Sequence, residues 1–297
     1  MAAQRAMKPF LRALACVALA MACLPAAGAE YLWEVVGLAN RVYLFGTVHA
    51  GKKDWYPLPK PVEDAFNDSK VLVVEADVTD AAAMRSASAN LVYKPPDSLS
   101  NHVPKEDYER FRKLLPRYRY PEDEVAQLKP FMAVSMLVFS EWGRQGFFPE
   151  FGVENYLIAK AKAEVKPIVE LEGVAAQMKM MDSLSDRENT LLFSGTVTAL
   201  ESGLTDEQIH GLVDAWKNGR PDELLEVARK YNAQVPGAAE FEDKFIWSRH
   251  AEMLAKIEGY LNDSRQRHFI AVGALHLAGP RGLVEQLRKR GYVVRQL

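Results

Sequence analysis

The stretch that decides the fold reads RVYLFGTVH over residues 41–49, and HFIAVGALH over residues 268–276 repeats its pattern. Each is a run of β-branched, aromatic and other apolar residues that leads into Gly-x-x-His. Such runs are typical of buried strands. When the two stretches are aligned on Gly46 and Gly273, their apolar runs superpose without a gap. We therefore expect two equivalent core strands, one from each end of the chain.

A histidine follows each of these strands at the same distance. Glycine lets the backbone turn sharply at a strand end, so that His49 and His276 can project from the ends of their strands. In sheets that are covered by helices, ligands gather at the carboxyl ends of the strands. Imidazole is the commonest metal ligand and titrates near neutral pH. The two histidines are therefore candidates for one shared site.

The rest of the chain indicates a single α/β domain over residues 30–297. A hairpin at about 31–45, a buried strand at 71–74 and a β-α-β pattern at the carboxyl-terminal end provide the strands. Residues from about 79 to 240 read mostly as helices, with one strand at about 165–172. Neither strand-rich end has enough strands for a stable sheet. We expect the N- and C-terminal parts to form one mixed central sheet, with a large helical insertion between them.

Residues 1–29 predict a cleaved signal peptide. Basic residues precede a short apolar run at 13–24, and Ala27-Gly-Ala29 fits a signal-peptidase site. The run is too short to span a bilayer, which takes about 20 residues. We expect an exported protein, periplasmic or secreted, without stable membrane insertion. A lipoprotein attached through Cys23 is the alternative.

The composition excludes several kinds of site and partner. Both cysteines, Cys16 and Cys23, fall in the predicted signal peptide, so the mature chain has no disulfide, thiolate ligand or cysteine nucleophile. The whole chain has 37 Lys and Arg against 39 Asp and Glu, and removal of the basic signal peptide makes it more acidic. This balance favours neither a nucleic-acid partner nor an anionic membrane surface.

Glu75 is the third candidate, because it directly follows the apolar strand at 71–74. With His49 and His276 it would form a His-His-carboxylate set, which suits Zn²⁺, Mn²⁺, Fe²⁺ or Co²⁺ and leaves positions open for water and substrate. A metal of this kind polarises a carbonyl and lowers the pKa of water, as hydrolysis requires. The alternative is structural: histidines that hydrogen-bond loops, and a glutamate that pairs with an arginine.

Two further carboxylates, Glu170 and Glu172, come at the end of the strand predicted in the insertion. A supporting role in the site is one interpretation, but a surface or ion-pair role is the one we favour from the sequence.

The chain resembles the TraB/PrgY/GumN proteins, whose animal relatives include the Tiki proteins that inactivate Wnt ligands. The resemblance covers nearly the whole mature chain and rests on short segments in a fixed order. These are Gly46-Thr-Val-His49, Tyr56-Pro-Leu-Pro59, the strand ending in Glu75, Gly152-Val-Glu-Asn155, Lys166-Pro-Ile-Val-Glu-Leu-Glu172 leading to Gln177, Arg249, and Gly273-Ala-Leu-His-Leu-Ala-Gly279.

This resemblance implies an α/β fold with one pocket, and a metal-dependent hydrolase that acts as a peptidase on a peptide or protein. It implies that His49, His276 and Glu75 bind a divalent Mn, Co or Zn ion, and that Glu75 is also catalytic. Arg249 would orient a carboxylate or stabilise an oxyanion. The family usually has asparagine after this arginine, whereas this chain has His250, a candidate extra ligand or catalytic base.

Two other functions fit the same residues. The first is a binding protein that sequesters a peptide or signal, as TraB and PrgY are thought to do with a pheromone, and it would need no metal. The second is a metal-assisted esterase, which the association of the GumN branch with exopolysaccharide suggests. The sequence leaves the choice among them open, together with the metal and the oligomeric state.

Overall fold

The computed structural model describes residues 30–233 and 236–297, so the predicted signal peptide and Cys23 lie outside the described residues. Within these residues, six strands form one sheet in the order β4-β3-β5-β2-β1-β6. The strands are β1 (Leu32–Val36), β2 (Arg41–Thr47), β3 (Val71–Val74), β4 (Ile168–Glu170), β5 (His268–Gly273) and β6 (Val293–Gln296).

The α-helices of the described residues lie mainly between β3 and β5. They are α2 (Lys60–Asp68), α3 (Ala81–Ser88), α4 (Lys105–Leu114), α5 (Glu122–Val125), α6 (Pro130–Arg144), α7 (Val153–Ala163), α8 (Val174–Asp182), α9 (Asp186–Ser202), α10 (Leu204–Lys217), α11 (Pro221–Asn232), α12 (Ala238–Phe245), α13 (His250–Asn262) and α14 (Leu283–Lys289). Across residues 30–233 and 236–297, none of them is long and apolar enough to cross a membrane.

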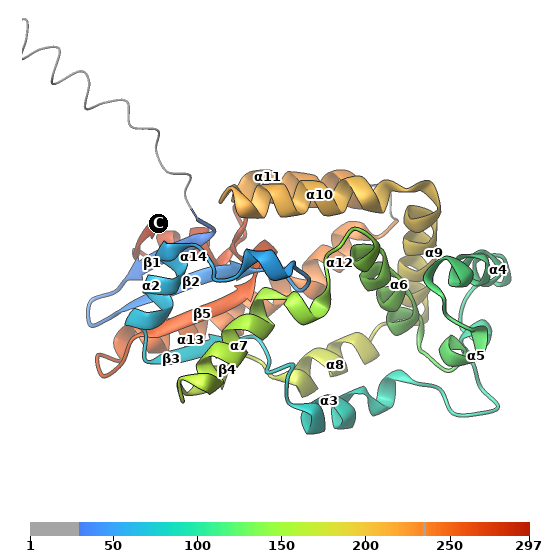
Figure 1. Ribbon diagram of the computed structural model, residues 1–297, viewed down its shortest axis with the longest axis horizontal. Helices are drawn as coiled ribbons and strands as arrows, with labels where there is room; N and C mark the ends of the chain where they lie inside the picture. Colours follow the sequence, from blue (N-terminus) through green and yellow to red (C-terminus); the bar gives the residue numbers. More distant parts are fainter. Residues whose placement is uncertain (1–29, 234–235) are drawn as a thin grey trace, which may run out of the picture.

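The two ends of the chain meet in the sheet. β2 runs parallel to β5, and Gly46 pairs with Val272 while Thr47 pairs with Gly273. β3 runs parallel to both β5 and β4, whereas β1 is antiparallel to β2 and β6. The predicted mixed sheet is therefore confirmed, and the two Gly-x-x-His segments leave adjacent parallel strands at the same edge (Figure 1).

Helices cover both faces of this sheet, which explains why its central strands are almost continuously apolar. Successive residues of β5 point to opposite faces. On one face Phe269 packs against Phe66 of α2, and on the other His268 stacks on Tyr260 of α13. α7 lies beside α2, and α14 lies beside α13 (Figure 1). The strand ends are thus the part of the sheet that is free to form a site.

The predicted helical insertion extends beyond the carboxyl ends of the parallel strands (Figure 1). Its outer helices have their own core, which includes Phe111, Leu137 and Phe193. Two of its elements, α7 and β4, return to the sheet. The strand predicted at 165–172 is shorter than expected, since β4 covers only Ile168–Glu170. Val165 has a left-handed backbone (φ 54°) and belongs to the turn by which the chain leaves α7.

The glycine at the end of β2 is required by close packing. A Cβ on Gly46 would lie 2.2 Å from the ring of Tyr31 on the neighbouring strand. The indole Nε1–H of Trp216, on α10, donates to the carbonyl of Gly46 at 2.7 Å. The sheet and the insertion therefore both fix the point at which the chain turns towards His49.

Candidate active site

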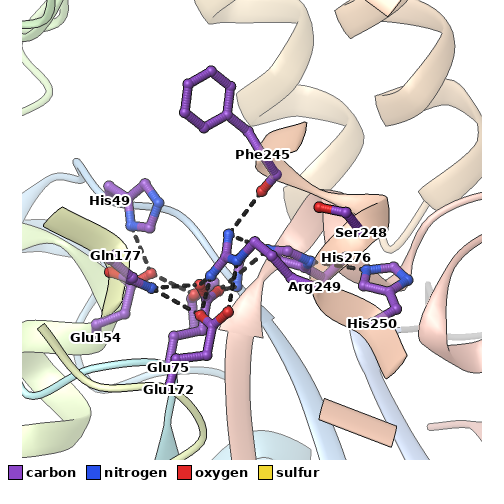
Figure 2. A network of polar contacts seen from close by, with 12 residues as sticks. His49, Glu75, Glu154, Glu172, Gln177, Phe245, Ser248, Arg249, His250 and His276 are labelled. Carbon is purple, nitrogen blue, oxygen red and sulfur yellow. Dashed lines mark hydrogen bonds and ion pairs between the residues drawn. The ribbon is translucent and has the colours of Figure 1, made fainter. Parts of the chain in front are cut away.

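A cavity of about 440 Å³ lies at the carboxyl ends of β2, β3 and β5. It is lined by four of the five residues that the sequence predicted for the site: His49, Glu75, Arg249 and His276. The fifth, His250, does not line the cavity and lies behind His276 (Figure 2). The strand ends and the start of α13 supply these polar groups, and the insertion supplies the other walls.

His49 is oriented by Glu154, at the start of α7. The imidazole Nδ1–H donates to Glu154 Oε1 at 2.8 Å (Figure 2). The hydroxyl of Thr47 donates to the same oxygen at 2.5 Å. The carboxylate charge and the hydrogen bond of Glu154 raise the pKa of His49 to about 9. The side chain is 67% exposed, so water screens part of the attraction. The other ring nitrogen of His49, Nε2, faces Gly273 and the cavity.

His276 is held by a chain of hydrogen bonds that fixes its tautomer. A carbonyl only accepts, so His250 Nδ1 donates to the carbonyl of Arg281 at 3.0 Å and its Nε2 is an acceptor. That Nε2 lies 2.9 Å from His276 Nδ1, which is therefore the donor. Burial lowers the pKa of each imidazole to about 4, so both rings are neutral at neutral pH. The lone pair of His276 is thus on Nε2, 3.7 Å from Glu75 Oε1.

Arg249 joins two buried carboxylates, Glu75 and Glu172. Its Nη2 donates to both, its Nε donates to Glu172 at 2.8 Å, and its Nη1 donates to His276 Nε2 at 3.1 Å (Figure 2). The three charged side chains are only 11 to 13% exposed. Burial raises the pKa of Glu75, but its neighbours, foremost His276 and Arg249, outweigh burial and lower this pKa to about 2. Glu75 is therefore ionised at neutral pH.

Three of these groups gather where Gly273 has no side chain. A Cβ on Gly273 would lie 3.3 Å from Glu75 Oε1, 3.6 Å from His276 Cδ2 and 4.0 Å from His49 Nε2. The Gly273 N–H also donates to Glu75 Oε1 at 2.6 Å. The candidate donor set comprises an ionised carboxylate and two imidazole Nε2 atoms whose Nδ1–H groups are already bound elsewhere. Because the pKa of His49 is raised to about 9, a metal must displace a proton from its Nε2 at neutral pH. Metal-binding histidines usually have such partners, so these residues fit a divalent first-row metal.

The same groups are paired with one another in the structure. Arg249 donates to His276 Nε2 and to one oxygen of Glu75, so a metal at those atoms would compete with the guanidinium. Among residues 30–233 and 236–297, no three His, Asp or Glu side chains already stand at the spacing of metal ligands. Binding therefore requires local rearrangement around Arg249.

Comparison with known proteins agrees with this architecture. The chain matches the model of the TraB/PrgY/gumN family over residues 31–296. It belongs to that family. YbaP of Escherichia coli K12, described as uncharacterized, is similar to this chain: it is 24% identical over 267 residues, which cover 88% of this chain and 94% of YbaP.

Animal metalloproteases are also similar to this chain. Metalloprotease TIKI1 of Danio rerio is 21% identical over 299 residues, which cover 85% of this chain and 60% of the relative. The metalloprotease TIKI homolog of Amphimedon queenslandica is 24% identical over 324 residues, which cover 90% of this chain and 61% of the relative. No solved structure matches the chain significantly.

The sequence interpretation underrated three residues of this site. The sequence indicates no role for Glu154. The ion pair favoured for Glu172 is confirmed, but its partner is Arg249, so it lies within the site and not at the surface. The amide of Gln177, on α8, donates to Glu75 at 3.1 Å and to Glu172 at 3.2 Å. Glu172 could have been found, because it follows β4 much as Glu75 follows β3. Glu170 instead accepts the backbone N–H of Asp77 at an exposed position.

Glu154→Gln is expected to lower the pKa of His49 and to weaken metal binding about 10- to 100-fold. Glutamine keeps the shape of the side chain and still accepts from Nδ1–H, but it lacks the negative charge that polarises the ring. NMR titration of the metal-free protein measures the pKa, and competition with a chelator measures the affinity. Glu150→Gln, at an exposed position in the preceding turn, is the matched control. Equal values for wild type and Glu154→Gln would contradict the role given to Glu154.

Proposed function

We propose that the chain is an exported, metal-dependent hydrolase that cleaves peptide bonds in a peptide or protein. The observation that carries the proposal is the approach of His49, Glu75 and His276 around Gly273, with the Nδ1–H of each imidazole already held by a partner. The names of the TIKI relatives, which are metalloproteases, support the reaction class. The predicted signal peptide at residues 1–29 supports the periplasm as the place of action.

His49, His276 and Glu75 would hold the divalent cation, for which Mn, Co and Zn are the candidates. Such a cation supplies Lewis acidity towards a carbonyl oxygen and a water molecule. The residues of the chain position and protonate the reacting groups. His250 keeps the proton of His276 on Nδ1, and Nε2 therefore remains a donor of electrons to the site.

Glu75 and Arg249 have complementary roles in this mechanism. Glu75 is ionised at neutral pH, so its carboxylate can accept a proton from the attacking water and deliver it to the amine nitrogen that leaves when the C–N bond breaks. The guanidinium of Arg249 lies beside it and stays cationic, because the carboxylates of Glu75 and Glu172 raise its pKa against the effect of burial. It can donate to the carbonyl oxygen of the substrate as negative charge develops there.

A second candidate is a protein that binds a peptide without turnover. The observation that favours it is the closed pairing of Arg249 with His276 Nε2 and with Glu75, which satisfies these groups without a metal. A binder of this kind would keep its affinity for peptides after treatment with a chelator.

Removal and return of metal separates the two candidates. The purified mature protein is stripped with a chelator, dialysed against Mn²⁺, Co²⁺ or Zn²⁺, and assayed on a mixed library of peptides by mass spectrometry. We expect near-stoichiometric metal by elemental analysis, and hydrolysis that is lost on stripping and returns with one of the metals. Peptide binding that persists without metal, and no cleavage under any condition, would exclude the hydrolase and favour the binder.

A further inference from the structure

The cavity has two chemically different sides. The titratable residues that line it are His49, Glu75, Arg249 and His276, all near the strand ends. The wall from the insertion is apolar apart from the amide of Gln177. It includes Phe139 and Trp142 of α6, Met180 and Met181 of α8, and Leu212 of α10. One substrate can therefore meet the polar groups and the apolar wall at the same time.

Part of this apolar wall is not buried as core. Phe139 is 41% exposed, and Met180 and Met181 are half-buried. α6 turns other residues, such as Leu137, into the core of the insertion, and leaves Phe139 at the cavity. Partly exposed apolar side chains that gather in a concave site with a few convergent polar groups are typical of ligand-binding pockets.

The charges at the strand ends already have partners. Glu75 accepts from the Gly273 N–H, from Gln177 and from Arg249, and Arg249 in turn joins Glu75 to Glu172. A charged substrate side chain placed against the apolar wall would lose its hydration without gaining an ionic partner there. The wall therefore selects for an apolar group.

Methionine side chains also determine how broad this selection is. Met180 and Met181 are unbranched and flexible, so they can adapt to apolar groups of different shapes. The cavity of about 440 Å³ lies within the range of small-ligand pockets, which is roughly 300–1,000 Å³. An aromatic, leucine or methionine side chain can enter together with part of the peptide backbone.

We infer that the preferred substrate carries an apolar side chain (leucine, methionine or phenylalanine) next to the cleaved bond, and that Phe139, Met180 and Met181 determine this specificity. The inference rests on the proposed function, since it names the substrate class of the same site. The insertion thus supplies recognition, while the strand ends supply the reacting groups.

Matched peptides test the inference. The peptides differ only at the residue beside the cleaved bond, which is leucine, phenylalanine, aspartate or lysine. We expect kcat/KM to be about 100-fold higher for the apolar pair. Binding of the same peptides to metal-stripped protein, followed by calorimetry, should show the same order. This second measurement does not depend on turnover.

Charged substitutions of Met181 should change which peptide is preferred. Met181→Glu should lower kcat/KM for the leucine peptide at least tenfold and favour the lysine peptide, whereas Met181→Lys should favour the aspartate peptide. Leu38→Glu and Leu38→Lys, at a fully exposed turn between β1 and β2, are the matched controls and should leave the order unchanged. Metal content should not change in any of these variants.

The outcomes separate the inference from the proposed function. If the leucine and phenylalanine peptides bind more tightly than the aspartate and lysine peptides but none is cleaved, the inference would be supported and the proposed hydrolase activity overturned. Cleavage without preference for apolar residues, or Met181 variants with the wild-type order, would overturn the inference and leave the hydrolase standing. Absence of both binding and cleavage for every peptide would overturn both.

Discussion

His49→Ala and His276→Ala are each expected to remove metal and hydrolysis together, with activity falling about 1,000-fold or more. The reason is that each variant deletes one of the two imidazole Nε2 donors beside Gly273. Stabilisation of the transition state by a metal is worth several kcal/mol, and each 1.4 kcal/mol corresponds to a tenfold change in rate. Elemental analysis and a peptide-cleavage assay measure the two quantities on the same preparation.

The two variants should differ in stability, and this difference makes the test decisive. His49 is 67% exposed but pairs with Glu154, which is only 15% exposed, so its removal should lower the free energy of unfolding by at most about 1 kcal/mol. His276 is buried and bonds to His250 and Arg249, so its removal leaves polar groups unsatisfied and should cost about 1–3 kcal/mol. Loss of metal from a His49→Ala protein that is still folded would therefore come from the site and not from unfolding.

His210→Ala is the control for these variants. His210 is exposed on α10 and does not line the cavity, so its removal should leave metal content, activity and stability unchanged. Full activity in both His49→Ala and His276→Ala would contradict the assignment of the metal ligands.

The pairing of the two chain ends could be predicted because it rests on a pattern of residues within each strand. The apolar runs before Gly46 and Gly273 have the same length, and both are followed by Gly-x-x-His. In the sheet, β2 and β5 are adjacent and parallel, and Thr47 pairs with Gly273. The same reasoning placed Glu75, because β3 is apolar at every position and the glutamate follows it directly.

The residues that orient these groups could not be predicted in this way, because tertiary packing brings them to the site. Glu154 reaches His49 because the start of α7 approaches the end of β2 very closely. A Cβ on Gly152 would lie 2.5 Å from the carbonyl oxygen of His49, and the N–H of Val153 donates to the carbonyl of Val48 at 3.0 Å. No periodicity within the insertion indicates where α7 returns to the sheet.

Arg249→Met is expected to destabilise the protein by about 3 kcal/mol or more. Glu75 and Glu172 would remain buried without their cationic partner, and an uncompensated buried charge is costly. Urea unfolding measures the change. The double variant Arg249→Met/Glu172→Gln should recover part of the loss, because it removes one of the two unpaired charges.

The destabilisation caused by Arg249→Met should depend on pH in a defined direction. The pKa of Glu75 is lowered to about 2 in the folded protein, against about 4.3 in an unfolded chain. A carboxyl with a lowered pKa contributes stability above its unfolded pKa, and this contribution is lost as the pH falls towards the folded value. The difference between wild type and Arg249→Met should therefore be largest near neutral pH and should shrink towards pH 3. A difference that does not vary with pH would contradict the ionic origin of the effect.

Arg249→Met should also separate metal binding from hydrolysis, which the histidine variants cannot do. The guanidinium competes for His276 Nε2 and Glu75, so its removal should leave metal affinity unchanged or raise it. Hydrolysis should nevertheless fall about 100- to 1,000-fold, because the donor for the developing negative charge is lost. Metal affinity by chelator competition and kcat/KM on one peptide measure the two effects. If the folded variant lost its metal as His49→Ala does, Arg249 would be needed to assemble the metal site, and its role towards the substrate would have to be abandoned.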